Sequence, residues 1–125
     1  MPRNVRTLAE VLREILSVPD FAGIEAIDPN TCGNFNTYPL HVAAVWNDCV
    51  AIRLLVESGA CLDQEGEHGF TPLMEAVAQG NSQAAELLIS LGAKPLPNDY
   101  GELPSAHALV LGHAELASLL LRLNR

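Results

Sequence analysis

The sequence has few basic residues. Its 125 residues include seven Lys and Arg against fifteen Asp and Glu, which gives a formal net charge of −8 at pH 7. Proteins that bind nucleic acid or anionic membranes normally do so by neutralising phosphate groups with Lys and Arg. We therefore expect neither nucleic acid nor a membrane as a partner. The same charge favours a protein partner with a basic surface, through an attraction that salt weakens.

Cysteine is also scarce, and no apolar stretch is long enough to cross a membrane. Cys32, Cys49 and Cys61 cannot all pair within one chain, and no two of them have the C-x-x-C spacing. Free thiols suit a reducing compartment. Charged residues interrupt the first fourteen positions, and no uninterrupted apolar core of a secretory signal follows them. These absences predict a cytoplasmic protein.

Residues typical of catalysis do not form a recognisable motif. His41 and Cys49 could suggest a base and a nucleophile, but a buried free cysteine is usually an inert small hydrophobic residue. His107 and His113 have no metal-ligating partner at a useful spacing. There is no glycine-rich phosphate loop, and nothing marks two carboxylates as an acid–base pair. We therefore expect no catalytic residues, no cofactor and no metal ion.

What the sequence contains instead is an internal repeat. Pro39 begins the segment PLHVAA, and Pro72, 33 residues later, begins PLMEAV. The same spacing relates Asn47 to Gly80, and it also relates paired leucines and Gly-Ala dipeptides further along. A third copy begins at Pro104, 32 residues after the second. Landmarks of several kinds in one register indicate a repeat protein, in which each unit buries its apolar face only against its neighbours.

Each repeat is predicted to form two short helices joined by a tight turn. Thr71 can cap the first helix through its hydroxyl, and Pro72 suits the first helical position, where a missing N–H has no cost. Gly80 and Gly112 stand where that helix should end in a left-handed conformation, and Asn47 is the next best residue for this place. The second helix should place its paired leucines on the buried face.

These segments resemble the ankyrin-repeat family, whose signature includes T-P-L-H-x-A with a 33-residue period. Residues 38–43, YPLHVA, depart from the signature at the Thr, and residues 71–76, TPLMEA, depart at the His. Residues 103–108, LPSAHA, lose both and have Ser in place of a core Leu. The resemblance implies an all-α solenoid of stacked antiparallel helix pairs with protruding hairpin-like fingers. It also implies that His41, at the signature His, hydrogen-bonds the backbone of a loop.

The ends of the chain fit the same register as degenerate repeats with polar outer faces. The first helix has one apolar face, and Pro19 should interrupt the chain before a short second helix. At the other end Asn124 stands at the place of Gly59. The apolar face of the first helix comprises Val5, Leu8, Val11, Leu12, Ile15 and Leu16. The resemblance predicts a single domain over 1–125, with a capping repeat at about 4–36 and repeats at about 37–69, 70–101 and 102–125.

Ankyrin-like proteins recognise partners with their finger tips and the inner faces of their first helices, so the resemblance also predicts binding residues. In each repeat, the residues four and two positions before the proline and seven positions after it are expected at the finger tip or on the inner face of the first helix. Four of the six aromatic residues of the chain occupy these nine positions. Exposed aromatic side chains are typical of binding hot spots. The nine residues are Phe35, His68, Tyr100, Thr37, Phe70, Glu102, Trp46, Gln79 and Leu111.

Acidic residues accompany this set. Glu67 and Asp99 are neighbours of its members in the sequence, and with Glu102 they predict an acidic surround suited to a basic partner. The alternative is that the finger aromatics pack onto the neighbouring finger without any partner. Trp46 could likewise pack against the N-terminal repeat.

Charge and resemblance together predict a protein–protein interaction module that is not an enzyme and is monomeric when free. The first hypothesis is a dedicated inhibitor, such as an immunity protein or antitoxin, that covers a basic toxin or enzyme domain. Opposite charges would then raise the association rate. The second hypothesis is an adaptor or scaffold subunit that leaves its client active. A third is small-molecule binding or catalysis in the groove, because a fold does not fix a function.

Overall fold

The computed structural model describes residues 6–123, which form α-helices and short 3-10 helices without any β-strand. The predicted all-α class is therefore confirmed. None of the helices in this part of the chain combines the length and the apolar character needed to span a bilayer. The helices are α1 (Leu8–Leu16), α2 (Pro39–Val45), α3 (Cys49–Glu57), α4 (Pro72–Gln79), α5 (Ser82–Ser90), α6 (Pro104–Leu111) and α7 (Ala114–Leu123), and the 3-10 helices are η1 (Pro19–Phe21), η2 (Asn34–Asn36) and η3 (Glu67–Gly69).

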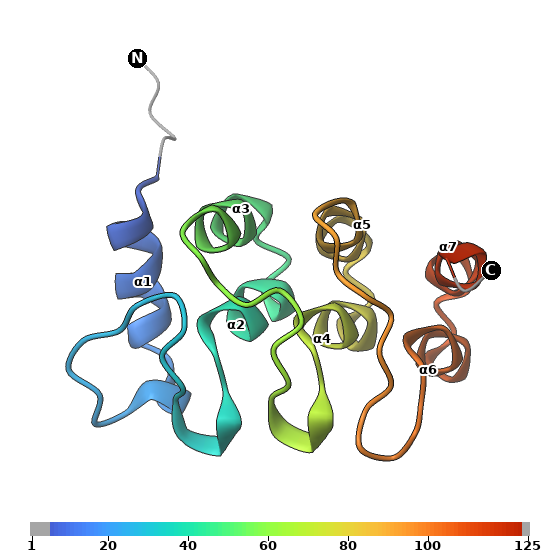
Figure 1. The fold of residues 1–125 in the computed structure, drawn as a ribbon, viewed down its shortest axis with the longest axis horizontal. Helices are drawn as coiled ribbons and strands as arrows, with labels where there is room; N and C mark the ends of the chain where they lie inside the picture. The colour runs from blue at the N-terminus through green and yellow to red at the C-terminus, as the bar shows by residue number, and fades with distance from the viewer. Residues whose placement is uncertain (1–5, 124–125) are drawn as a thin grey trace.

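The helices from α2 onward form two rows, as the ankyrin resemblance implies (Figure 1). The inner helices α2, α4 and α6 make one row and the outer helices α3, α5 and α7 the other. Along the rows, α2 packs on α4, α4 on α6, and α3 on α5. Three loops extend past the inner helices, and we call them the first (33–37), second (66–70) and third (98–102) fingers. The stack thus has a face made of inner helices and fingers.

Local signals set the ends of the inner helices. The Thr71 hydroxyl accepts a hydrogen bond from the Met74 N–H at 3.2 Å, so the predicted cap of α4 is confirmed. Gly80 and Gly112 end α4 and α6 with φ of 71° and 84°, and Asn47 takes φ of 56° after α2. Left-handed φ favours glycine, with Asn as the best replacement. The helix ends therefore follow the sequence landmarks.

Side chains of one repeat cap the helices of the next. Asn47 Oδ1 accepts a hydrogen bond from the Ala84 N–H at 2.9 Å, in the first turn of α5. In return, Asn81 Nδ2 donates to the carbonyl oxygens of Ala44 and Val45, at 3.0 and 2.8 Å, at the end of α2. These bonds satisfy helix-terminal groups that have no partner within their own helix. The exchange fixes the rotation of one repeat on its neighbour.

The N-terminal repeat departs from the pattern of helix pairs. In Figure 1, α1 is seen from the side, whereas the later helices are seen nearly along their axes. The chain breaks at Pro19 as predicted, and the short second helix is the three-residue 3-10 helix η1, not an α-helix. Pro19 begins η1, and Phe21 at its end is fully buried. Burial of this single large ring holds the segment without a second α-helix.

The predicted apolar face of α1 packs on the stack. Val11 and Ile15 are fully buried, and Leu8, Leu12 and Leu16 are partly buried against the core. Val5, predicted on the same face, lies outside the described residues. One apolar stripe of a single helix therefore closes the N-terminal end.

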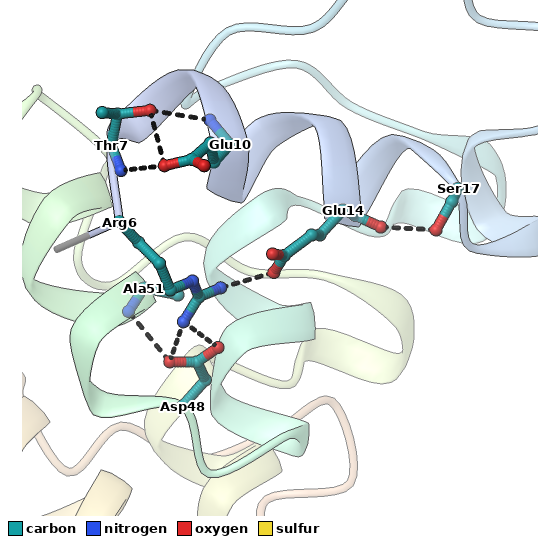
Figure 2. A network of polar contacts seen from close by, with 7 residues as sticks. All are labelled: Arg6, Thr7, Glu10, Glu14, Ser17, Asp48 and Ala51. Atoms are coloured by element: carbon teal, nitrogen blue, oxygen red, sulfur yellow. Dashed lines mark hydrogen bonds and ion pairs between the residues drawn. The ribbon is translucent and has the colours of Figure 1, made fainter. Parts of the chain in front are cut away.

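Polar contacts fix the beginning of α1 (Figure 2). The Thr7 hydroxyl accepts a hydrogen bond from the Glu10 N–H at 3.1 Å, while the Glu10 carboxylate accepts one from the Thr7 N–H at 2.8 Å. Arg6 donates to both carboxylate oxygens of Asp48, at 2.9 and 2.8 Å, and also to Glu14. Asp48 in turn caps α3 by accepting from the Ala51 N–H. One arginine thus joins α1 to the second repeat.

The C-terminal repeat does not have the predicted polar face. Leu109 and Val110 of α6 are 58% and 81% exposed, and Leu121 of α7 is also exposed. The prediction carried the polar outer face of the first helix over to the C-terminal repeat and did not consider the residues of α6. Leu109 stands at the place of Ala44 and Val77, which are buried in the middle of the stack. Asn124, predicted at the place of Gly59, lies outside the described residues.

Candidate protein-binding surface

The three fingers share one backbone design. In each of them the N–H of the first residue donates to the carbonyl oxygen of the fifth, at 2.6, 2.8 and 3.0 Å in the first, second and third fingers. The bond closes a tight loop and leaves the residues between its ends at the tip. These tips hold the predicted residues Phe35, His68 and Tyr100.

The tips of the first two fingers require an unusual backbone. Phe35 and His68 have φ of 61° and 59°, in the left-handed region that non-glycine residues seldom adopt. The Phe35 side chain is 71% exposed, so it gains little from packing. Strained residues of this kind concentrate at functional sites. Phe35 is therefore held in a conformation that presents its ring to solvent.

The second and third fingers contact each other at their tips. The Tyr100 hydroxyl oxygen lies 3.1 Å from His68 Nδ1, and the two ring centroids are 5.9 Å apart. The Asp99 N–H donates to the His68 carbonyl oxygen at 3.0 Å. Tyr100 nevertheless remains 68% exposed. The predicted packing of a finger aromatic on its neighbour thus occurs here and leaves most of the ring accessible.

Asn98 braces the third finger, and the sequence interpretation missed it. This buried side chain accepts hydrogen bonds through Oδ1 from the N–H groups of Tyr100 and Glu102, at 2.9 and 3.1 Å. Its Nδ2 donates to the Glu102 carboxylate at 2.9 Å. Asn that bonds backbone two residues ahead is a common turn signal, and this signal was present in the sequence. The exposed Glu102 carboxylate is consequently held in place.

Two predicted residues are turned inward. The half-buried Phe70 ring meets the His107 ring edge-on, with centroids 5.6 Å apart and planes at 87°. The half-buried Thr37 donates its hydroxyl hydrogen to Asp20 at 2.6 Å. Both side chains have partners inside the chain, so they contribute to finger packing. Their role in binding another protein stays a prediction.

The inner helices expose apolar side chains at the two ends of their row, and we call Val45, Trp46, Val110 and Leu111 together the apolar stripe. Trp46 is 43% exposed at the end of α2, and Leu111 is exposed at the end of α6, with the exposed Gln79 between them on α4. Val45 and Val110, each one residue before the predicted position, are exposed beside them. The sequence interpretation missed this sixth position after each proline. Its signal was an apolar residue in all three copies, Val45, Ala78 and Val110.

A recess of about 220 Å³ lies between the N-terminal repeat and the inner helices. Val42, Val45 and Trp46 of α2 line one side of it, and Val18 lines the side of the N-terminal repeat. Trp46 and the N-terminal repeat thus line one recess, and Trp46 keeps an exposed surface. The packing of Trp46 against that repeat stays a prediction.

Three carboxylates also line the recess, and one of them has an altered pKa. Asp20 comes from η1, Glu67 from the second finger and Glu75 from α4. Burial, with smaller contributions from the charges of Glu67 and Asp20, raises the pKa of Glu75 to about 7. Within residues 6–123, Glu75 has no ion-pair partner. Glu75 is therefore a carboxyl group without a counter-charge.

His41 also lines the recess. Its ring is buried, and Nε2 lies 2.8 Å from the carbonyl oxygen of Phe70 in the second finger. The implied hydrogen bond from His41 to a loop backbone is confirmed. Burial lowers the pKa of His41 and thereby favours the neutral form of the ring. His41 thus ties the second finger to α2.

The remaining groups considered for chemistry are scattered. Cys49 is half-buried, while Cys32 and Cys61 are exposed, and all three are free thiols. Among residues 6–123, no three His, Cys, Asp or Glu side chains are placed to hold a metal ion. The exposed carboxylates of Glu67, Asp99 and Glu102 lie on the second and third fingers.

Comparison with known proteins agrees with the geometry. The family described as ankyrin repeats (3 copies) matches residues 7–99. Human protein phosphatase 1 regulatory subunit 27 is 43% identical over 67 residues, which cover 53% of this chain and 44% of that protein. The Arabidopsis thaliana ADP-ribosylation factor GTPase-activating protein AGD2 is 39% identical over 64 residues, 51% of this chain and 8% of that protein.

A longer match is to ankyrin repeat domain-containing protein 13C-B of Xenopus laevis, 33% identical over 100 residues. It covers 77% of this chain and 19% of that protein. The chain spans less than half the length of each of these relatives. The matched family covers most of the described helices, and the chain belongs to the ankyrin-repeat family, whose repeats bind other proteins.

Proposed function

We propose that this chain binds one protein through its inner helices and fingers and blocks the activity of that protein. The observation that carries the proposal is the exposure of Val45 and Trp46 at the end of α2, of Val110 and Leu111 at the end of α6, and of Tyr100 at a finger tip. Large exposed apolar side chains gathered on one face mark interaction surfaces. Trp and Tyr are also the residues most often found at binding hot spots.

Charge supports a basic partner. Carboxylates of Glu67, Asp99 and Glu102 are exposed on the second and third fingers. An apolar centre with a charged rim is the usual anatomy of a protein interface. Complementary charge raises association rates and excludes wrong partners. With a net charge of −8, the molecule as a whole adds to the same attraction.

Regulation by binding is also consistent with one relative. The human protein phosphatase 1 regulatory subunit is, by its name, a regulator of an enzyme, which supports a binding role without catalysis. The alternative is a non-inhibitory adaptor or scaffold subunit. It is favoured by the larger relatives, in which the matched repeats are a small share of the protein.

The test is capture of the partner followed by an activity measurement. Tagged protein is used to capture partners from a lysate of its source cells, and the captured protein is purified. An inhibitor should form a one-to-one complex that abolishes the activity of the partner. An adaptor should bind two proteins at separate surfaces and leave their activities unchanged, and this result would overturn the inhibitor proposal.

A further inference from the structure

The recess beside Trp46 is small and open to solvent on one side. Its volume is about 220 Å³. Pockets for drug-sized molecules are larger, at roughly 300 to 1,000 Å³. The apolar wall formed by Val42, Val45 and Trp46 suits an aliphatic stem or a flat group. The recess opens on the same face as the apolar stripe, since Val45 and Trp46 belong to both.

The charge of the recess is of one sign. Asp20, Glu67 and Glu75 line it from three separate elements, and no Lys or Arg is among the lining residues. Asp20 already accepts the Thr37 hydroxyl hydrogen, whereas Glu75 is half-buried without a counter-charge. Burying a carboxylate is unfavourable unless a cation or hydrogen-bond donors accompany it. A cation at this place would supply the missing charge.

We propose that the recess receives one arginine side chain of the protein partner, with its guanidinium between Trp46 and the carboxylates of Glu67 and Glu75. The inference rests on the proposed binding function and specifies its anchor. Arginine fits better than lysine for two reasons. Its planar group stacks on an aromatic ring, and its five N–H donors reach carboxylates on more than one side. Lysine offers a compact ammonium without a stacking face.

The experiment uses the intact protein and a small probe, so it needs no knowledge of the partner. Trp46 is the only tryptophan of the chain, so its indole N–H gives a single signal in a ¹H–¹⁵N spectrum. N-acetyl-arginine amide is titrated, with N-acetyl-citrulline amide as the uncharged match and N-acetyl-lysine amide as the charged match. A saturable shift of the Trp46 signal with the arginine probe, at least about fivefold tighter than with either match, is expected.

Variants of the recess carboxylates test whether the arginine probe binds in the recess. Glu75→Gln and Glu67→Gln should each weaken the arginine probe about fivefold or more, because each removes a charge-assisted hydrogen bond. Glu86→Gln removes an exposed carboxylate of the outer helix α5, outside the recess, and should leave binding unchanged. Equal binding of arginine and citrulline, or no loss in Glu75→Gln, would overturn the proposal. Equal binding of lysine would overturn the choice of arginine.

Failure of this inference can be told apart from failure of the proposed function. If the arginine probe does not bind while the captured partner binds through Trp46 and Tyr100, the recess is not an anchor site and the binding function stands. If the probe binds while no protein is captured one to one, the recess is a cation site and the inhibitor proposal falls.

Discussion

The hydroxyl oxygen of Tyr100 lies 3.1 Å from Nδ1 of His68, so a hydrogen bond joins the tips of two fingers 32 residues apart. Both tips remain exposed. The contact orders two side chains before any partner arrives, which lowers the entropic cost of association. The fingers therefore form a preorganised edge beside the apolar stripe of the inner helices.

Replacement of Phe35 by glycine should separate binding from folding. Glycine adopts the left-handed backbone of this tip without strain, and the exposed phenyl ring contributes little to packing. The free energy of unfolding in urea should stay the same or rise by up to about 1 kcal/mol. Partner affinity should fall. A loss of more than about 1 kcal/mol in stability would show that the ring is structural.

Two glycines provide a matched test of how the third repeat packs on the second. Both Gly80 and Gly112 have left-handed φ, but a Cβ at Gly80 would lie 2.7 Å from Cε1 of His113, whereas a Cβ at Gly112 would meet nothing within 4 Å. Gly112→Ala should therefore cost only the backbone strain, about 1 kcal/mol. Gly80→Ala should cost about 1 kcal/mol more, because the ring must move. Equal melting temperatures of the two variants would contradict this packing.

His41→Met tests the bond between α2 and the second finger. Methionine is a natural choice, because Met74 occupies the same place in the next repeat. The change leaves the Phe70 carbonyl oxygen without its partner and should cost about 1 to 3 kcal/mol of unfolding free energy.

The pH dependence of this loss follows from the lowered pKa of His41. A histidine with a lowered folded-state pKa stabilises the fold above its ordinary pKa of 6.5, and this contribution is lost as the pH falls. The difference between wild type and His41→Met should therefore shrink from pH 7.5 to pH 5, as urea titrations at each pH would measure. A constant difference would show that the ring is not held neutral.

Glu75→Gln should stabilise the protein, and more so at high pH. Because the folded-state pKa is raised to about 7 from 4.5, ionisation of Glu75 removes stability as the pH rises between these values. The variant should match wild type near pH 4.5 and exceed it by about 1 to 2 kcal/mol at pH 8, a figure reduced for partial contact with solvent. Glu86→Gln, at an exposed site on α5, is the control. A destabilised variant at pH 8 would contradict the account.

The inner helices could be predicted from the sequence because their signals are local. Proline at the first position of a helix and glycine after its last residue each act within one helical turn. These signals recur at the spacing between Pro39 and Pro72. The N-terminal repeat could not be predicted in the same way. Its η1 turn depends on burial of Phe21 against residues of the first finger, since a Cβ at Gly33 would lie 2.8 Å from the Phe21 ring.

The candidate surface was predicted only where residues follow the repeat offsets. Trp46, Tyr100 and Leu111 are exposed at such positions. The recess was not predicted, because Asp20 and Glu75 are 55 positions apart in the sequence and meet only when the N-terminal repeat docks on the inner helices. Contacts between repeats that differ in structure leave no periodic signal.

The central claim is that the inner helices and fingers bind the partner, and calorimetric titration of the captured partner tests it most directly. The double variant Trp46→Ala/Tyr100→Ala is compared with Val50→Ala/Leu121→Ala, which removes exposed apolar residues from the outer helices α3 and α7. We predict that the first variant folds with an unchanged helical spectrum and binds at least about tenfold more weakly, while the second binds as wild type does. Unchanged affinity of a folded Trp46→Ala/Tyr100→Ala variant, or an equal loss in both variants, would contradict the account.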